Sequence, residues 1–309
     1  MNYATELATR FAMAGAHLPE ELRRRTLDYV IAQQRPDGGF AGRQGESDPY
    51  YTSFAVRTLA AIGGFDDARA ARADGWFSDQ LLRGFGPLDC LSLLAIAPIL
   101  ELVLGDECAG GRFDSASALA ALAGDLARND GCYAKTARSG PSSTYMTYLM
   151  LLAMQSENVP VLEPGKLAAC IAARQRDDGG FAELDVIRRS GTNPTAAAVG
   201  VLRALDVLTE PQALAAARFL EGMQHGGGLR AAAVAPTPDL LSTMTALVAQ
   251  ADLKVDCRLD TAALREYVAA LEAPGGGFRG GTWDDTPDVE YTFYGTLALG
   301  MLEMGDAQS

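Results

Sequence analysis

The chain has 309 residues, of which 48% are hydrophobic and 21% charged, so it is long enough to bury a sizeable core. Its net charge of -13 argues against nucleic-acid binding, which needs a concentrated basic face that the sequence does not show. Five widely spaced cysteines without a C-x-x-C pair indicate reduced, buried thiols in a cytoplasmic protein. The excess of arginine over lysine, together with abundant alanine, is typical of a bacterial gene of high GC content.

The N-terminal segment carries acidic residues and no apolar stretch, so we predict no signal peptide there. The longest apolar run, Cys90–Leu100, contains Ser92 and Pro98 and is followed by Glu101. A transmembrane helix needs about 20 apolar residues. We therefore predict a buried helix at this run and no membrane span.

A glycine signal recurs along the whole chain. Its reference glycines are separated by 47, 45, 49, 47 and 49 residues. A nearly constant spacing of this size is the signature of a repeat protein. We predict a single domain over residues 1–309 with about six repeats of about 47 residues. The signals are QRPDGGF (Gly39), GFGP (Gly86), NDGCY (Gly131), QRDDGGF (Gly180), QHGGGL (Gly227) and GGGF (Gly276).

The segments on both sides of each glycine signal have helical periodicity. Leu22–Gln34 and Ala216–Gln224 precede a signal, and the apolar residues of Ala55–Ile62 and Val199–Leu205 follow one. Asp-Gly-Gly fits a helix C-terminus, because glycine accepts the left-handed backbone of the closing residue. Each repeat therefore reads as an outer helix, a glycine turn, a loop and an inner helix, and the fold class is all-α.

The inner helices have a recurrent start 8 to 12 residues after the glycine signal. An Asp or Asn side chain at this point can accept a hydrogen bond from an unpaired N–H of the first turn. Proline suits the first helical position. We interpret four residues as such N-caps: Asp48, Asn193, Asp239 and Asp288.

The segments QRPDGGFAGR…DPYYTSFAVRTLAAIG (Gln34–Gly63) and GGGFRGGTWDDTPDVEYTFYGTLALGML (Gly275–Leu302) resemble one known repeat. It is the repeat of protein prenyltransferase β subunits and of squalene-cyclase-type (class II) terpene cyclases, and the resemblance covers nearly the whole chain. It implies an α/α toroid, in which six helical hairpins close around an aromatic-lined cavity that holds an isoprenoid. It also implies that a helical protein partner can dock over one end of the barrel.

The prenyltransferase metal site is incomplete in this chain. The resemblance places the zinc-binding Asp at Asp239, but Leu241 stands at the Cys position and Tyr291 at the His position. Zinc needs three or four N, S or O ligands, and leucine supplies none. Of the basic residues that bind diphosphate, only Arg230 remains, and it is out of position. We expect no zinc and no zinc-dependent protein prenylation, with magnesium bound only if a diphosphate is.

The terpene-cyclase branch offers a proton donor instead. Pro287–Thr292, PDVEYT, resembles the frame of the D-x-D-D-T acid motif, with Glu290 at the donor position and Tyr291 in place of the next Asp. Asp288 would act as the neighbour that assists Glu290. Alternatively, Asp288 only caps the helix and Glu290 only faces its dipole. TWDDT, at Thr282–Thr286, also resembles this motif but lies in a loop, where we expect its acids to be solvated.

Further candidates could bind a substrate. Aromatic rings at the inner-helix starts and in the last loop either line the cavity and stabilise a cation or pack in the core. Arginines in the loops after the glycine turns either receive an anionic ligand or pair with nearby acids. With Asp239, the substrate-binding candidates are Tyr51, Tyr291, Tyr294, Trp283, Arg43, Arg230 and Arg279.

Three functions remain open. The first is an enzyme that acts on an isoprenoid or other apolar substrate, with a cyclase-like reaction initiated by Glu290. The second is a non-catalytic protein that kept the barrel and binds a hydrophobic ligand or a protein partner. The third is a prenyl diphosphate transferase without zinc, which would use the loop arginines and Asp284 and Asp285.

Overall fold

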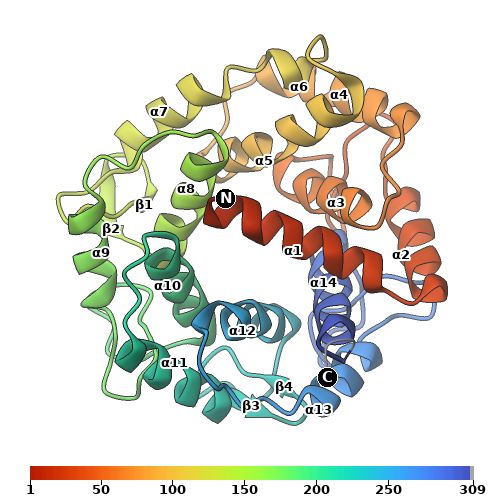
Figure 1. Cartoon of the computed structure of the whole chain (residues 1–309). Coiled ribbons are helices and arrows are strands. Elements are labelled where there is room, and N and C mark those ends of the chain that lie inside the picture. The colour runs from red at the N-terminus through yellow and green to blue at the C-terminus, as the bar shows by residue number, and fades with distance from the viewer. Residues whose placement is uncertain (307–309) are drawn as a thin grey trace. The chain divides into compact units, whose positions relative to one another are not determined.

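The computed structural model describes residues 1–306, and these form fourteen helices and two short antiparallel hairpins (Figure 1). The prediction of an all-α chain is confirmed. The helices are α1 (Tyr3–His17), α2 (Glu20–Ala32), α3 (Pro49–Ala61), α4 (Asp67–Leu81), α5 (Pro87–Leu104), α6 (Ala109–Arg112), α7 (Ser115–Leu126), α8 (Thr144–Ser156), α9 (Pro164–Ala172), α10 (Thr192–Ala204), α11 (Glu210–Met223), α12 (Leu240–Leu253), α13 (Thr261–Ala270) and α14 (Val289–Asp306). The hairpins pair β1 (Ala134–Thr136) with β2 (Ser139–Ser142) and β3 (Gln224–His225) with β4 (Gly228–Leu229).

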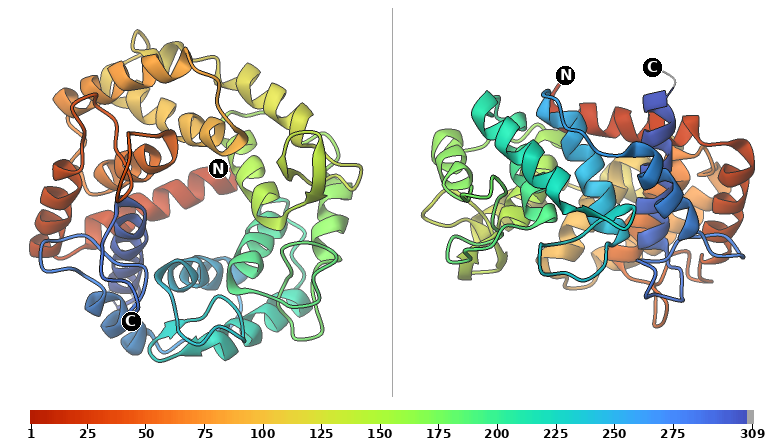
Figure 2. Two further views of the ribbon diagram at one scale, coloured as in Figure 1. Left: turned by 180° about the vertical axis from the view of Figure 1, so that it is seen from behind. Right: turned by 90° about the horizontal axis from the view of Figure 1, so that it is seen from below.

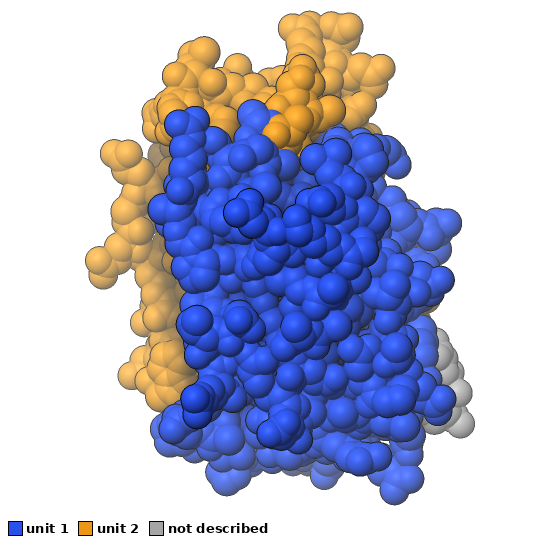
Figure 3. Space-filling view, turned by 90° about the vertical axis from the view of Figure 1, so that its left-hand side faces the viewer, with its two compact units in different colours: residues 1–7, 121–270 blue, residues 8–120, 271–309 orange. Residues whose placement is uncertain are grey.

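The chain forms two compact units (Figure 3). Unit 1 consists of Met1–Leu7 and Ala121–Ala270, and unit 2 of Ala8–Ala120 and Leu271–Ser309. In unit 1, α10 packs against α8, α9, α11 and α12. In unit 2, α3 packs against α2, α5 and α14, and α4 packs against α5 and α6; Figure 2 shows the same helices from two further directions. The prediction of one domain over the whole chain remains a prediction.

Five of the six predicted glycine turns share one structure. In each, a residue before the turn pairs antiparallel with a residue after it, so the outer helix ends in a tight loop. The sixth signal, at Gly86, differs, because Gly86 is the N-cap of α5 and leads directly into that helix. The five pairs are Gln34 with Phe40, Ala127 with Tyr133, Gln175 with Phe181, Gln224 with Leu229, and Glu272 with Phe278.

A buried threonine of the following inner helix completes each of the five turns. Its hydroxyl accepts a hydrogen bond from the backbone N–H that closes the turn, at 2.8–3.1 Å. This contact satisfies a buried donor that would otherwise lie unpaired. It was not predicted from the sequence, although the threonines recur 12 to 14 residues after the turn. They are Thr52, Thr147, Thr195, Thr243 and Thr292.

Three of the four predicted N-caps are confirmed. Asp48 accepts from the N–H of Tyr51, Asp239 from that of Ser242 and Asp288 from that of Tyr291, each at 2.8 Å. The fourth prediction, Asn193, is wrong. Helix α10 begins two residues earlier than expected, with Gly191 as N-cap, and the Asn193 side chain instead accepts a hydrogen bond from the Thr245 hydroxyl at 2.8 Å.

Helix α5 is longer than the apolar run from which it was predicted. It spans 18 residues, and within residues 1–306 it is the one helix long and apolar enough to cross a membrane by length and composition alone. Core helices of soluble proteins pass the same test. Leu93, Ile96 and Leu100 are fully buried in the core of unit 2, where α5 packs against α3, so the predicted buried helix is confirmed.

Candidate functional site

Six of the predicted site residues line one cavity of about 520 Å³ in unit 2. Two loops form it, one between the first glycine turn and α3, the other between the last glycine turn and α14. Each loop leads into a capped inner helix, so the cavity lies at the N-terminal ends of α3 and α14. The lining residues are Gly42, Arg43, Gln44, Tyr51, Trp283, Asp284, Asp288, Glu290 and Tyr291.

Arg43 joins the two loops by binding two carboxylates. Its Nη1 donates to Oδ1 of Asp284 at 2.9 Å, its Nη2 donates to Oδ2 of the same residue, and its Nε donates to Oδ2 of Asp288 at 3.0 Å. The bidentate contact to Asp284 has the planar geometry in which guanidinium and carboxylate bind most strongly. Asp284 and Asp288 are 6% and 7% exposed, so Arg43 neutralises charges that have little access to water.

Asp284 is built into the loop as an anion. Burial raises the pKa of its carboxyl, but the hydrogen bonds from Arg43 and from the backbone N–H groups of Gly280 and Thr286 outweigh burial, and the net pKa is lowered. The expectation that the acids of the Thr282–Thr286 loop are solvated is therefore wrong for Asp284, because Arg43 holds it inside. It is correct for Asp285, which is exposed.

Glu290 lies in the first turn of α14 and is partly buried. Its Oε1 accepts hydrogen bonds from the hydroxyls of Tyr50 at 2.7 Å and Tyr294 at 3.3 Å. Burial raises the pKa of the Glu290 carboxyl, and the nearby charge of Asp288 raises it further, against the hydrogen bonds from the two tyrosines. The site thus favours the neutral acid while it also offers two donors to the carboxylate.

Asp288 combines two tasks. One oxygen caps α14, and the other binds Arg43 at 3.0 Å. Burial raises the pKa of the Asp288 carboxyl, although the N–H of Tyr291 and the charge of Arg43 oppose the change. The predicted pair of Asp288 and Glu290 therefore lies at one cavity with its two pKa values raised by burial, which is a frequent property of functional carboxylates.

Aromatic side chains surround Glu290 on the protein side. The ring of Tyr50 contacts those of Tyr51 and Phe54, and the ring of Tyr294 contacts those of Phe54 and Tyr291, with centroids 5.0–6.3 Å apart. The Arg43 guanidinium lies 5.9 Å from the centroid of the Tyr291 ring. The rings supply apolar contact area next to the acid.

Two glycines let the loops lie flat on the lining rings. A Cβ atom on Gly42 would come within 2.5 Å of the Tyr51 ring, and one on Gly280 within 2.6 Å of the Tyr291 ring. The loop backbone therefore packs closely against both rings at the cavity wall. Trp283 is 59% exposed, so its ring is available at the open side of the cavity.

Four predicted residues do not line this cavity. One of them, Tyr294, contacts Glu290, and the other three lie elsewhere. Asp239 belongs to unit 1, where its carboxyl caps α12 and accepts from the backbone N–H and the hydroxyl of Ser242, each at 2.8 Å. Arg230, also in unit 1, donates to the backbone carbonyls of Gly222 and Ala233. Arg279 belongs to unit 2, and its Nε lies 3.4 Å from the carbonyl oxygen of Leu271. Their roles in substrate binding remain predictions.

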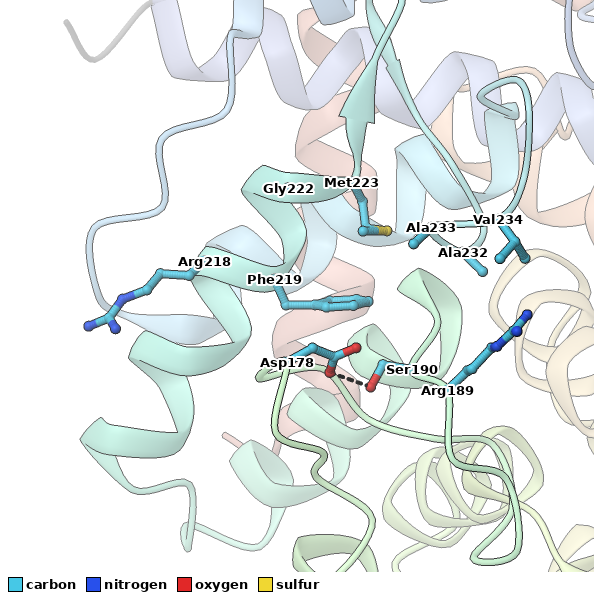
Figure 4. Close-up of a pocket in the computed structure, with 10 residues that line it drawn as sticks. All are labelled: Asp178, Arg189, Ser190, Arg218, Phe219, Gly222, Met223, Ala232, Ala233 and Val234. Carbon is cyan, nitrogen blue, oxygen red and sulfur yellow. Dashed lines mark hydrogen bonds between the residues drawn. The ribbon is translucent and has the colours of Figure 1, made fainter.

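Unit 1 has a cavity of its own, of about 450 Å³ (Figure 4). Asp178 accepts a hydrogen bond from the Ser190 hydroxyl at 2.7 Å, and the Phe219 ring lies beside this pair (Figure 4). Asp37 and Ser47 make the same contact, at 2.9 Å, in the first glycine turn. The Asp178–Ser190 pair is thus part of the repeat, and none of the predicted site residues lines this cavity.

Three residues at the site were missed or misjudged from the sequence. Tyr50, which was not predicted, follows Pro49 in the first turn of α3, and this places its hydroxyl within reach of α14. The available signal was the DPYYT segment, which is aromatic twice in succession just after a cap. Asp284 was expected in solvent and is instead buried. Gln44 lines the cavity without any distinguishing signal in the sequence.

A family model for the prenyltransferase alpha-alpha toroid domain matches residues 7–84, 91–231 and 240–309. The chain belongs to this family. Its predicted fold class, the α/α toroid, and its predicted superfamily are thereby confirmed. No curated protein matches the chain at a significant level.

Solved structures of several enzymes share the fold. A type II terpene cyclase, MstE from Scytonema, has 14% identity and a TM-score of 0.64, covering 94% of this chain and 99% of the cyclase. A protein geranylgeranyltransferase-I from Candida albicans has 13% identity and a TM-score of 0.53, with 96% and 83% covered. A GH76A alpha-1,6-mannanase from Salegentibacter sp. HEL1_6 has 10% identity and a TM-score of 0.63, with 92% and 98% covered. At these identities the likeness shows the fold, and the chemistry must be argued from the site.

Proposed function

We propose that the chain is a cyclase-like enzyme in which Glu290 protonates an isoprenoid or similar apolar substrate in the cavity of unit 2. One observation carries the proposal. Glu290 is a partly buried carboxyl that lines a cavity and receives hydrogen bonds from Tyr50 and Tyr294, while burial raises its pKa. The family membership agrees with a substrate of this class, since a type II terpene cyclase of the same fold was solved with geranylgeranyl dihydroxybenzoate as its substrate.

Protonation of an alkene makes two demands on the acid. The carboxyl must be neutral before the step, and its conjugate base must be stabilised as it forms. Burial and the nearby charge of Asp288 favour the neutral form of Glu290. The hydroxyls of Tyr50 and Tyr294 then stabilise the carboxylate, because they already donate to the oxygen that becomes charged.

The step itself is short. The proton moves from the Glu290 carboxyl to one carbon of a substrate double bond, and the other carbon becomes a cation. A second double bond of the chain attacks this cation and closes a ring, and the cyclised cation then loses a proton to give the neutral product. The faces of Tyr51 and Tyr291, both lining the cavity, are suited to stabilise the cation.

The contacts of Arg43 argue against a diphosphate in this cavity. Its three donor nitrogens are bound to Asp284 and Asp288, and Glu290 adds a third carboxyl to the lining. A prenyl diphosphate would have to break a bidentate ion pair and approach acidic groups. A transferase without zinc is therefore a weaker candidate here, with or without magnesium.

The test uses the full chain and a panel of polyprenyl compounds, each as the free alcohol, the diphosphate and an aryl conjugate. We expect a cyclised product from at least one member, the diphosphate group being retained where it is present, and loss of this product in Glu290→Gln. Release of pyrophosphate would indicate a transferase instead. A polyprenyl compound that stays bound in native mass spectrometry without being converted would indicate a non-catalytic binding protein and contradict the proposal.

A further inference from the structure

The glycine turns share a second packing rule, and one turn breaks it. In four turns, a glycine packs directly under an aromatic ring of the next outer helix, so that a Cβ atom on the glycine would come within 2.8 Å of the ring. In each of these turns, the preceding glycine packs against the backbone of one residue in the same outer helix. The ring belongs to the residue four positions after that backbone contact. The four pairs are Gly39 with Trp76, Gly180 with Phe219, Gly228 with Tyr267, and Gly277 with Tyr29.

The turn that differs follows α7 in unit 1. Its Gly131 packs against the backbone of Lys166 and Leu167. The residue four positions after Lys166, where the other turns have their ring, is Cys170. The glycine position is occupied by Cys132, which is fully buried. Two cysteines thus stand at the positions where the four other turns have a glycine and an aromatic ring.

The two thiols lie close together beside a carboxylate. The Sγ atoms of Cys132 and Cys170 and a carboxylate oxygen of Asp130 all lie within 4.8 Å of one another. Cys170 is partly exposed, while Cys132 is not. Asp130 has the same role as the corresponding acids of other turns, since it accepts from the N–H of Cys132 at 3.0 Å and from the Ser142 hydroxyl.

A buried arginine is directed at this cluster. Arg174 is 1% exposed, and its Nη2 lies 3.5 Å from Sγ of Cys170 and 3.9 Å from Oδ2 of Asp130. Its Nε is buried without a hydrogen-bond partner. A guanidinium in this position stabilises a thiolate. It also repels a divalent cation, although three potential ligands are at hand.

We propose that Cys132 and Cys170 form a reversible oxidation site, in which a peroxide converts the two thiols into a disulfide between the glycine turn and α9. The thiolate of Cys170 attacks one oxygen of hydrogen peroxide, becomes a sulfenic acid and releases hydroxide. The thiol of Cys132 then attacks the sulfenic sulfur, the S–S bond forms, and water leaves. A small dithiol reverses the reaction by thiol–disulfide exchange.

The electrostatics of the pair suit these two roles. The hydrogen bond from Cys132 lowers the pKa of the Cys170 thiol against the effect of burial, and Arg174 lowers it further. The same hydrogen bond and burial raise the pKa of the Cys132 thiol. Burial raises the pKa of Cys90 to about 11 and that of Cys257 to about 12, so these thiols serve as unreactive references in the same chain.

The test treats the reduced full-length protein with a small excess of hydrogen peroxide at neutral pH. Free thiols are then blocked with a maleimide after denaturation, and the intact mass is measured. We expect a loss of about 2 Da and two fewer adducts than the five thiols of the reduced chain allow, both restored by dithiothreitol. Peptide mapping without reductant should join the peptides of Cys132 and Cys170.

Cys132→Gly is the matched variant, because glycine restores the residue found in four other turns and the fold should tolerate it. In this variant Cys170 should stop at the sulfenic acid, seen as a gain of about 16 Da that dimedone captures. Arg174→Gln should slow the first step on the order of tenfold, because less of Cys170 is ionised.

Three results would overturn the proposal. One is that all five thiols of the parent protein remain reactive after peroxide treatment. Another is a disulfide that involves a different cysteine. The third is the retention of one zinc ion per chain that is lost in Cys170→Ser, because the cluster would then be a metal site.

Discussion

Helices α12 and α14 start with closely related segments, PDLLST at Pro238–Thr243 and PDVEYT at Pro287–Thr292. The Asp caps the helix in both, and the Thr accepts from the turn that precedes it in both. The two segments differ in the residues between, where α12 has Leu241 and Ser242 and α14 has Glu290 and Tyr291. The cap and the threonine therefore belong to the scaffold of the repeat, and the acid and its tyrosine neighbour are the residues that we propose make α14 part of a site.

Removal of the Glu290 carboxyl is the strongest test of this comparison between α12 and α14. Glu290→Gln keeps the size and the hydrogen-bond acceptor of the side chain but removes the proton, so turnover should fall about 10²–10⁴-fold. The corresponding change in α12, Leu241→Gln, should leave turnover within about twofold, because Leu241 does not line the cavity. Product formation by both variants under single-turnover conditions measures the difference. Equal losses would mean that the position matters only for the scaffold.

The Arg43 ion pairs should give the next largest effect. Arg43→Ala leaves Asp284 and Asp288 buried without their cation, and we expect a loss of about 2 kcal/mol in the free energy of unfolding. Arg138→Ala is the control, since its pair with Asp125 is exposed and should contribute less than about 1 kcal/mol. Urea unfolding of both variants at low salt gives the two values. A smaller loss for Arg43 than for Arg138 would contradict this interpretation of the site.

The two N-caps, Asp239 of α12 and Asp288 of α14, allow a finer comparison of the scaffold with the candidate site. Asparagine caps a helix about as well as aspartate, so Asp239→Asn should change stability by less than about 0.5 kcal/mol. Asp288→Asn retains the cap but loses the charged contact to Arg43, and we expect a cost of about 1 kcal/mol. The same urea experiment distinguishes them, and equal values would show that Asp288 does no more than Asp239.

The smallest expected effect concerns pH. Because the folded pKa of Glu290 is raised, folding opposes its ionisation, and the parent protein loses stability as the pH rises through that folded pKa. Glu290→Gln cannot ionise and should be the more stable protein at pH 7, with the difference disappearing below the unfolded pKa of about 4.3. A lower stability of Glu290→Gln at pH 7 would show that the carboxylate is favoured in the folded protein.

The elements that could be predicted from the sequence are those set by short-range chemistry. The caps at Asp48, Asp239 and Asp288 depend on residues three positions away, and five of the glycine turns carry their signal in the turn residues themselves, so the residue types were sufficient signals. Asn193 was wrongly predicted as an N-cap, because an Asn followed by Pro is compatible with both the N-cap and the second helical position, N2. The candidate site was reached through the resemblance, which pointed to Glu290 and Asp288, and their roles remain predictions.

The parts that escaped prediction depend on residues far apart in the chain. Arg43 and Asp284 are 241 positions apart, and no local pattern indicates that one holds the other in the interior. Tyr50 and Glu290 are 240 apart. The exchange of a glycine and a ring for Cys132 and Cys170 likewise became visible only when the turns were compared in space. Such pairs require either the fold or an observable covariation between positions.

The central claim is that Glu290 delivers a proton to the substrate, and isotope incorporation in D2O tests it most directly. The protein is equilibrated in D2O, supplied with the polyprenyl compound that the panel identifies, and the product is analysed by mass spectrometry and NMR. We predict one non-exchangeable deuterium per product molecule, at a carbon of the first double bond to react, and no product from Glu290→Gln. A product without deuterium, or undiminished deuteration by Glu290→Gln, would contradict the claim.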